Sequence, residues 1–316
     1  MIFRIKPADN FIWNQQELAQ FLAAHQGQDI VIENGTEGCC AHAVGLYHWL
    51  DQFEFASVTI KTSNPLERHD HYRIEIVLPW KFVQVSQIID SRWHTWNRQQ
   101  VFGTVFGRPL WHRLGIAAHL LTQHRTISAV GFTADPRNQD QRELFELTGL
   151  WQHSPVGLQN FAQIWDQLPL YHTDIDAYTP GAHLTDGFVA QTQRIYQHFF
   201  VDIVAETFTS GQCFFVTEKT VRPMLLKKPF ITMGSRDHLA YLRQLGFRTF
   251  ADFWSEDYDG YSGQQRYERI LALIDQLASK SLDELEQMYW DMQYTLDHNY
   301  NLLINQNYNR QLKSLQ

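Results

Sequence analysis

The residues best suited to chemistry lie in the segment 215–223, which reads FVTEKTVRP. It holds one acid, Glu218, and two cations, Lys219 and Arg222, where a helix is expected to begin after an apolar run. A second apolar, strand-like run follows at residues 228–233. Helix starts at the carboxyl ends of strands favour phosphates, because unpaired backbone N–H groups and the helix dipole attract anions. The segment therefore indicates a site for a phosphorylated nucleoside, with a sugar nucleotide as the leading candidate.

Alternating strand and helix patterns in the N-terminal third predict a βαβ unit with a parallel sheet. The expected elements are a helix at 15–25, a strand at 29–33, a helix at about 41–53 and strands at 57–61, 73–78 and 82–85. A polar, aromatic segment without a clear period then spans residues 90–98. We place a domain boundary near residue 97, within that segment.

A second α/β stretch contains the charged segment. Its expected elements are strands at 101–106, 127–132, 199–204 and 229–233 and helices at 108–121, 218–226 and 237–245. Residues 135–185 are polar and irregular and are interpreted as an insertion, whereas the tail from residue 263 has a helical apolar period. The sequence thus predicts an N-terminal α/β domain at 1–97, a second α/β domain at 98–275 with an insertion at about 135–185, and C-terminal helices at 276–316.

Composition restricts the class of protein. The chain has 316 residues, of which 44% are hydrophobic, so it can bury a large core. Its formal net charge of −8 disfavours a nucleic-acid partner. Three cysteines, two of them adjacent, do not read as a disulfide framework and favour a reducing compartment. We expect a soluble, cytoplasmic protein without a transmembrane segment, although its many aromatic side chains leave peripheral membrane contact open.

Residues 217–223, followed by the run 228–231 and by Gly234, resemble the donor-binding signature of GT-B glycosyltransferases of the fucosyltransferase kind. In that signature a Thr-Glu-Lys element opens a helix, and an apolar strand ending in glycine follows. The resemblance implies a GT-B-like α/β fold, in which two Rossmann-type α/β domains face a cleft and helices follow at the carboxyl end.

Two further runs extend the resemblance. Residues 106–114 resemble an earlier element of the same fold, in which an arginine begins the nucleotide-binding domain. Residues 242–250 and 256–259 are similar to a group of bacterial and phage glycosyltransferases. The resemblance covers roughly residues 101–275.

The resemblance also implies roles for the charged residues. Glu218 would accept hydrogen bonds from the ribose hydroxyls, and Lys219 would meet the diphosphate. Arg113 would be the second cation, because a planar guanidinium suits two phosphate oxygens and the charge of a departing nucleotide. The other expected members of the donor site are Thr217, Arg222, Glu206, Arg108 and Gly234.

The chain departs from the family pattern in two places. Fucosyltransferases carry an aromatic-Glu-Asn triplet before the Thr-Glu-Lys element, and here the nearest acid is Glu206, which we interpret as its counterpart. The stretch from Arg113 to Glu218 is also longer than the pattern, which supports the insertion at residues 135–185. The donor sugar therefore stays open.

A transferase that inverts its anomeric centre needs a base for the acceptor's proton, usually from the opposite domain. Glu33 and Glu37 flank the turn after the first expected strand, where α/β folds place functional groups, and they are the expected catalytic carboxylates. His42 is a further candidate. Each of the three can equally be a loop or surface residue without a catalytic role.

No metal and no other cofactor is expected. Asp174 and Asp176 match the Asp-x-Asp spacing of manganese-dependent glycosyltransferases, but so short a pattern is common by chance. The cluster at residues 69–71 lacks the spacing of zinc ligands. The phosphate loop, the dinucleotide-binding glycines and the serine elbow are also missing from the sequence, which disfavours kinases, oxidoreductases and hydrolases.

The sequence therefore predicts a metal-independent, inverting glycosyltransferase. It would move a sugar from a nucleotide-diphosphate sugar to a hydroxyl acceptor such as a glycan or surface polysaccharide. One alternative is a non-catalytic protein that binds a nucleotide or glycan. Another is a phage-type enzyme that glycosylates modified DNA bases, against which the acidic chain counts.

Overall fold

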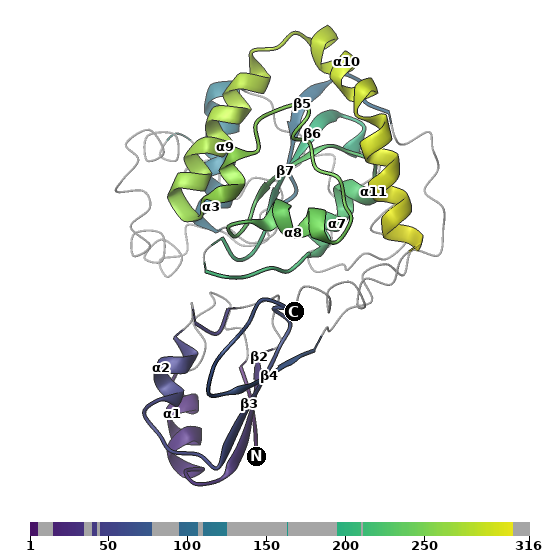
Figure 1. The fold of residues 1–316 in the computed structure, drawn as a ribbon. Helices are drawn as coiled ribbons and strands as arrows, with labels where there is room; N and C mark the ends of the chain where they lie inside the picture. Colours follow the sequence, from purple (N-terminus) through teal and green to yellow (C-terminus); the bar gives the residue numbers. More distant parts are fainter. Residues whose placement is uncertain are drawn as a thin grey trace.

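The structure is a computed structural model of the chain. It describes residues 1–5, 15–34, 40–42, 45–77, 95–106, 110–124, 163, 195–209 and 211–305. The architecture is α/β, with two parallel sheets that belong to two units of the chain (Figure 1). The predicted α/β class with parallel sheets is thereby confirmed.

The N-terminal sheet has one face covered by helices. Its strands are β1 (Ile2–Arg4), β2 (Asp29–Asn34), β3 (Ser57–Thr62) and β4 (Arg73–Ile76), paired in parallel in the order β1-β2-β3-β4. Every second residue of β2 and of β3 is buried, as a sheet with one packed face requires. Helices α1 (Gln15–Ala24) and α2 (Leu46–Leu50) contribute leucines to the same apolar cluster.

Two expectations for this unit need correction. The helix expected at about 41–53 is shorter, because α2 begins only after Gly45, whose φ of 73° is left-handed. Strand β1 was not predicted, since three residues carry too little pattern; its pairing with β2 orders it. The strand expected at 82–85 lies outside the described residues.

The second sheet is buried on both faces. Its strands are β5 (Gln100–Gly103), β6 (Phe199–Ala205) and β7 (Phe230–Met233), all parallel, with β6 in the middle and every residue of β6 buried. Helices α3 (Trp111–His119) and α9 (Gly263–Ala278) lie on one side, and α7 (Glu218–Leu225) and α11 (Gln293–Asn305) on the other (Figure 1). Such complete burial is typical of a strand covered from both sides, and Asp202 is the one residue of β6 that is not apolar.

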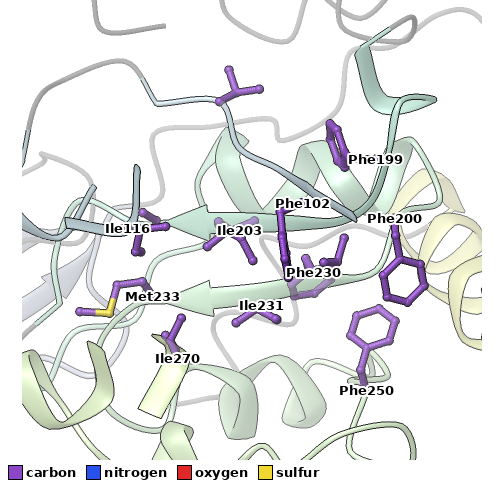
Figure 2. Packing of buried hydrophobic residues seen from close by; sticks show 14 of the residues in the cluster. Phe102, Ile116, Phe199, Phe200, Ile203, Phe230, Ile231, Met233, Phe250 and Ile270 are labelled. Carbon is purple, nitrogen blue, oxygen red and sulfur yellow. The ribbon is translucent and has the colours of Figure 1, made fainter. Parts of the chain in front are cut away.

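Large side chains from separate elements fill this core (Figure 2). Phe102, Ile203 and Phe230 come from the three strands, and Ile116 and Ile270 come from the helices α3 and α9. Helices α8 (His238–Gln244) and α10 (Leu282–Asp291) add to the same cluster, so the C-terminal helices share their core with the second sheet. At Gly103 an added Cβ would lie 2.0 Å from the buried ring of Phe199, so only glycine fits.

The predicted helices at 218–226 and 237–245 are confirmed as α7 and α8, and the strands at 199–204 and 229–233 as β6 and β7. The strand expected at 101–106 ends earlier, at Gly103. The expected strand at 127–132 and the insertion at about 135–185 lie outside the described residues, apart from residue 163. No helix in the described part of the chain is both long and apolar enough to cross a bilayer.

Candidate functional site

The candidate site lies at the carboxyl edge of the second sheet. Thr104, Glu206 and Gly234 directly follow β5, β6 and β7, and parallel strands end at the same edge. Helix α7 begins near this edge, with Thr217 as its N-cap. The Thr217 side chain accepts a hydrogen bond from the backbone N–H of Lys219 at 3.1 Å, which satisfies one of the otherwise unpaired donors of the helix start.

A buried carboxylate ties this helix start to β6. Glu206 is 3% exposed and accepts hydrogen bonds from the hydroxyls of Thr217 and Thr220, both at 2.6 Å. The backbone N–H of Thr217 donates to the same carboxylate at 3.4 Å. A negative charge is stabilised at the positive end of a helix. Glu206 therefore positions α7 from within, and it shares a small cavity with Cys213, Ser235 and His238.

Two cations from separate helices converge beside this carboxylate. Arg113, in α3, is buried and donates to the carbonyl oxygen of Ala205 at 3.0 Å. Lys219, in α7, is partly buried, and its Nζ lies 3.3 Å from the hydroxyl of Thr217. The structure thus brings together two of the cations that the sequence assigned to a diphosphate.

His112 lies close enough to both cations to feel their charges, and it was not singled out from the sequence. Its Nε2 lies 3.0 Å from the carbonyl oxygen of Glu206, so Nε2 carries the proton. Burial first, and then the charges of Arg113 and Lys219, lower the pKa of His112 to about 3, so its ring is neutral at pH 7. The sequence signal that could have identified His112 was its position beside Arg113 at the start of an expected helix.

Arg222 is placed differently from Lys219. The sequence put both on nearly the same helix face, but the structure buries Arg222, whose Nε donates to the Tyr196 hydroxyl at 2.7 Å. That hydroxyl in turn donates to Asp202, and burial raises the pKa of Asp202 to about 6 although Arg222 opposes the shift. In the described part of the chain, Arg222 therefore contacts buried residues of the core.

Of the other residues that the resemblance assigned to the donor site, the structure describes Gly234 but not Arg108 or the side chain of Glu218. Gly234 follows β7 and packs closely on His238, since an added Cβ would lie 3.2 Å from that ring. Burial, and then the charge of nearby Arg266, lower the pKa of His238 to about 3. Helix α7 begins at Glu218, but the Glu218 side chain and the whole of Arg108 lie outside the described part of the chain.

A pocket of about 390 Å³ lies where the two units meet. The N-terminal unit lines it with residues that follow β2 and β3, and the second unit lines it with residues that follow β6. These residues are Cys40, His42, Leu66, Glu67, Arg68, Gly211 and Gln212. Asn64 bridges the units, since its amide donates to the carbonyl of Gln212 at 2.8 Å and its Oδ1 accepts from the Phe214 N–H at 3.1 Å. The chain from Gln212 to Thr217 leads directly from this pocket to the start of α7.

Glu67 organises the wall of the pocket and was missed in the sequence. Its carboxylate is almost fully buried and accepts from the backbone N–H of Ala41 at 2.9 Å and from the Tyr47 hydroxyl at 2.7 Å. It holds the short segment that presents His42 to the pocket. No sequence pattern marked Glu67, because its partners come from distant loops.

Neither of the two expected catalytic carboxylates is among the described residues that line this pocket. Glu33 lies within β2 and pairs with Arg4 at 2.6 Å, and it is not among the described residues that line the pocket. Glu37 lies outside the described residues. Of the three candidate bases, the structure therefore brings His42 alone among the described ones to the pocket.

No model of a known protein family matches the chain, and no curated protein matches it significantly.

Proposed function

We propose that the protein is a glycosyltransferase that uses a nucleotide-diphosphate sugar, with its two α/β units in a GT-B-like arrangement. The observation that carries the proposal is the convergence of Arg113 and Lys219, from two different helices, on the carboxyl edge of a parallel sheet beside a helix start. Cations and helix N-termini at such an edge suit a diphosphate. The pocket between the units supplies room for an acceptor next to this site.

In the proposed reaction the oxygen of an acceptor hydroxyl attacks the anomeric carbon. The bond between that carbon and the diphosphate oxygen breaks, and the nucleotide diphosphate departs with the electron pair. Lys219 and Arg113 oppose the negative charge that grows on the departing group. Their positive charges are held in place by Thr217 and Ala205, so little reorganisation is needed as the bond breaks.

His42 is the proposed base for the acceptor's proton. It lines the pocket at the carboxyl end of the N-terminal sheet, across from residues 211 and 212 of the second unit. An imidazole nitrogen can accept the proton of a hydroxyl that becomes acidic only during transfer. Glu67 acts as a positioning residue, because it binds the backbone N–H of Ala41 next to His42.

The donor site can be tested by a thermal-shift panel of UDP, GDP, CMP and dTDP sugars, each with and without EDTA. A ligand at 100 times its Kd stabilises the folded state by about 2.7 kcal/mol, which raises the Tm of a chain of 316 residues by roughly 4 °C. Lys219→Ala should remove the shift, whereas Lys280→Ala, a matched lysine after α9, should keep it. A panel without any shift, or an unchanged shift in Lys219→Ala, would overturn the donor site.

Catalysis is separated from mere binding by following the slow hydrolysis of the donor that shifts the Tm, in the absence of acceptor. A transferase releases free sugar, whereas a binding protein leaves the donor intact. His42→Ala should lower sugar transfer by about 10²-fold or more, the usual contribution of a general base, while the thermal shift stays the same. Full transfer activity in His42→Ala would exclude this residue as the base.

A further inference from the structure

A histidine pair and an aspartate converge on one point, away from the proposed donor site. His119 is the last residue of α3, His124 ends the π-helix Leu120–His124, and Asp275 lies in α9. The Nε2 atoms of both histidines lie 2.7 Å from the same oxygen, Oδ1 of Asp275. The three possible ligand atoms all lie within 4.8 Å of one another.

The π-helix creates this convergence. Residues five apart on an α-helix point about 140° away from each other, because each residue turns the chain by about 100°. The wider π turn over Leu120–His124 brings His119 and His124 to the same side, where their rings lie 5.4 Å apart. Short π segments are rare and are frequent at functional sites, since they are kept despite their poorer geometry.

The chemistry of the three groups matches a metal site. His119 is almost fully buried, and its ring is held against the Asp275 carboxylate. In the contacts described, each Nε2 carries a proton toward the Asp275 oxygen; with an ion bound, the ring proton would lie on Nδ1 and the Nε2 lone pair would face the ion, with the carboxylate oxygen as the third ligand. Asp275 is half exposed, with 53% of its side chain accessible, which leaves a path for an ion and room for water.

We infer that His119, His124 and Asp275 form a binding site for a divalent first-row transition-metal ion, with Zn²⁺ as the best match. Two imidazole nitrogens and one carboxylate oxygen form a common ligand set for Zn²⁺, and water completes its coordination. The three possible ligand atoms already face one another. A bound ion would therefore take the place of the two direct contacts between the imidazole rings and the Asp275 oxygen. Such an ion would join the end of α3 to α9.

The site is separate from the donor site. Arg113 and His112 lie in the first turn of α3, and His119 lies at its other end, about 10 Å away along the helix axis at 1.5 Å per residue. The ion therefore does not reach the proposed diphosphate and has a stabilising role. This inference does not depend on the proposed function.

Metal binding can be measured on the full chain without any activity assay. The protein is stripped with a chelator, loaded with Zn²⁺ or Co²⁺ and desalted, and the bound metal is counted by mass spectrometry. We expect about one equivalent of Zn²⁺, a rise in Tm on loading, and visible Co²⁺ absorption bands of a four- or five-coordinate site. Less than one tenth of an equivalent, with no change in Tm, would overturn the inference.

Variants assign the ion to this site. His124→Gln and Asp275→Asn lie at partly exposed positions, so both should fold while losing the bound ion and the Co²⁺ bands. His48→Gln, at an exposed position in α2, is the matched control and should bind as the natural protein does. Circular dichroism checks that each variant is folded. A folded His124→Gln and a folded Asp275→Asn that both keep one equivalent would place the ion elsewhere and refute the site.

Discussion

As the pH rises from 7 to 9, the natural protein should gain unfolding free energy relative to the variant Lys228→Met. Lys228 lies within the segment that resembles a donor signature, yet its side chain is completely buried under the second sheet. Its Nζ donates to the carbonyl oxygens of Phe199 at 3.2 Å and Thr95 at 3.3 Å, and it lies 4.9 Å from the centre of the Tyr289 ring. Burial lowers the pKa of Lys228 from 10.5 to about 7.

The sign and size follow from this depressed pKa. A group with a lower pKa in the folded state contributes stability that is present above its unfolded pKa and is lost as the pH falls toward the folded value. Between pH 7 and pH 9 the unfolded chain keeps its proton on Lys228, while the folded chain releases it. At about 1.36 kcal/mol per pH unit, with half that slope near pH 7, the gain is about 2 kcal/mol.

The assay is urea unfolding of both proteins at pH 6, 7, 8 and 9. Taking the difference between natural protein and Lys228→Met cancels every other titrating group, and the loss of the two carbonyl contacts adds an offset that is the same at every pH. The difference should be flat below pH 6 and should rise from pH 7 to pH 9. A difference that stays constant over the whole range would refute a neutral, buried Lys228. Nucleotide-induced thermal shifts should be the same in both proteins, because this lysine lies in the core.

Two further substitutions test the elements that hold the site. Gly103→Ala should lower the unfolding free energy by roughly 3 kcal/mol, because its new Cβ overlaps the buried Phe199 ring. The control Gly260→Ala places its Cβ in open space and should change the stability little. Equal denaturation midpoints for the two variants would contradict this reasoning. Thr217→Val should cost about 2 kcal/mol and weaken the nucleotide shift, since Glu206 and the Lys219 N–H lose a partner, while Thr217→Ser should restore both. Loss of stability in Thr217→Ser as large as in Thr217→Val would show that the methyl group matters and the hydroxyl does not.

Local patterns predicted most of the regular elements because their signals are short-range. Strands β2, β3 and β6 and helix α7 all appear in the structure where the sequence predicted them. Where the signal was weak, prediction failed. Strand β1 has three residues and depends on its pairing with β2, and the helix expected from residue 41 is delayed by the left-handed Gly45.

The charged residues show that the sequence pattern does not predict which side chains are buried. Lys219, Arg222 and Lys228 looked alike in the sequence, as cations within the segment that resembles a donor signature. Packing separates them: Lys219 stays partly exposed beside Thr217, Arg222 is enclosed by Tyr196, and Lys228 is enclosed below β6. Residues three apart on a helix differ by about 60° in direction, which is enough for one to face solvent and the next to face a sheet.

The sequence by itself determined that this chain builds parallel α/β units, and it located the helix start with Thr217 and Lys219 after an apolar run. Tertiary structure decided which groups meet there. Arg113 joins Lys219 through the packing of α3 on β6, Glu67 meets Ala41 across loops, and a π turn brings His119 and His124 to Asp275. The physical reason is that strand and helix periods depend on neighbouring residues, whereas these contacts join residues that only the folded core brings within hydrogen-bonding distance.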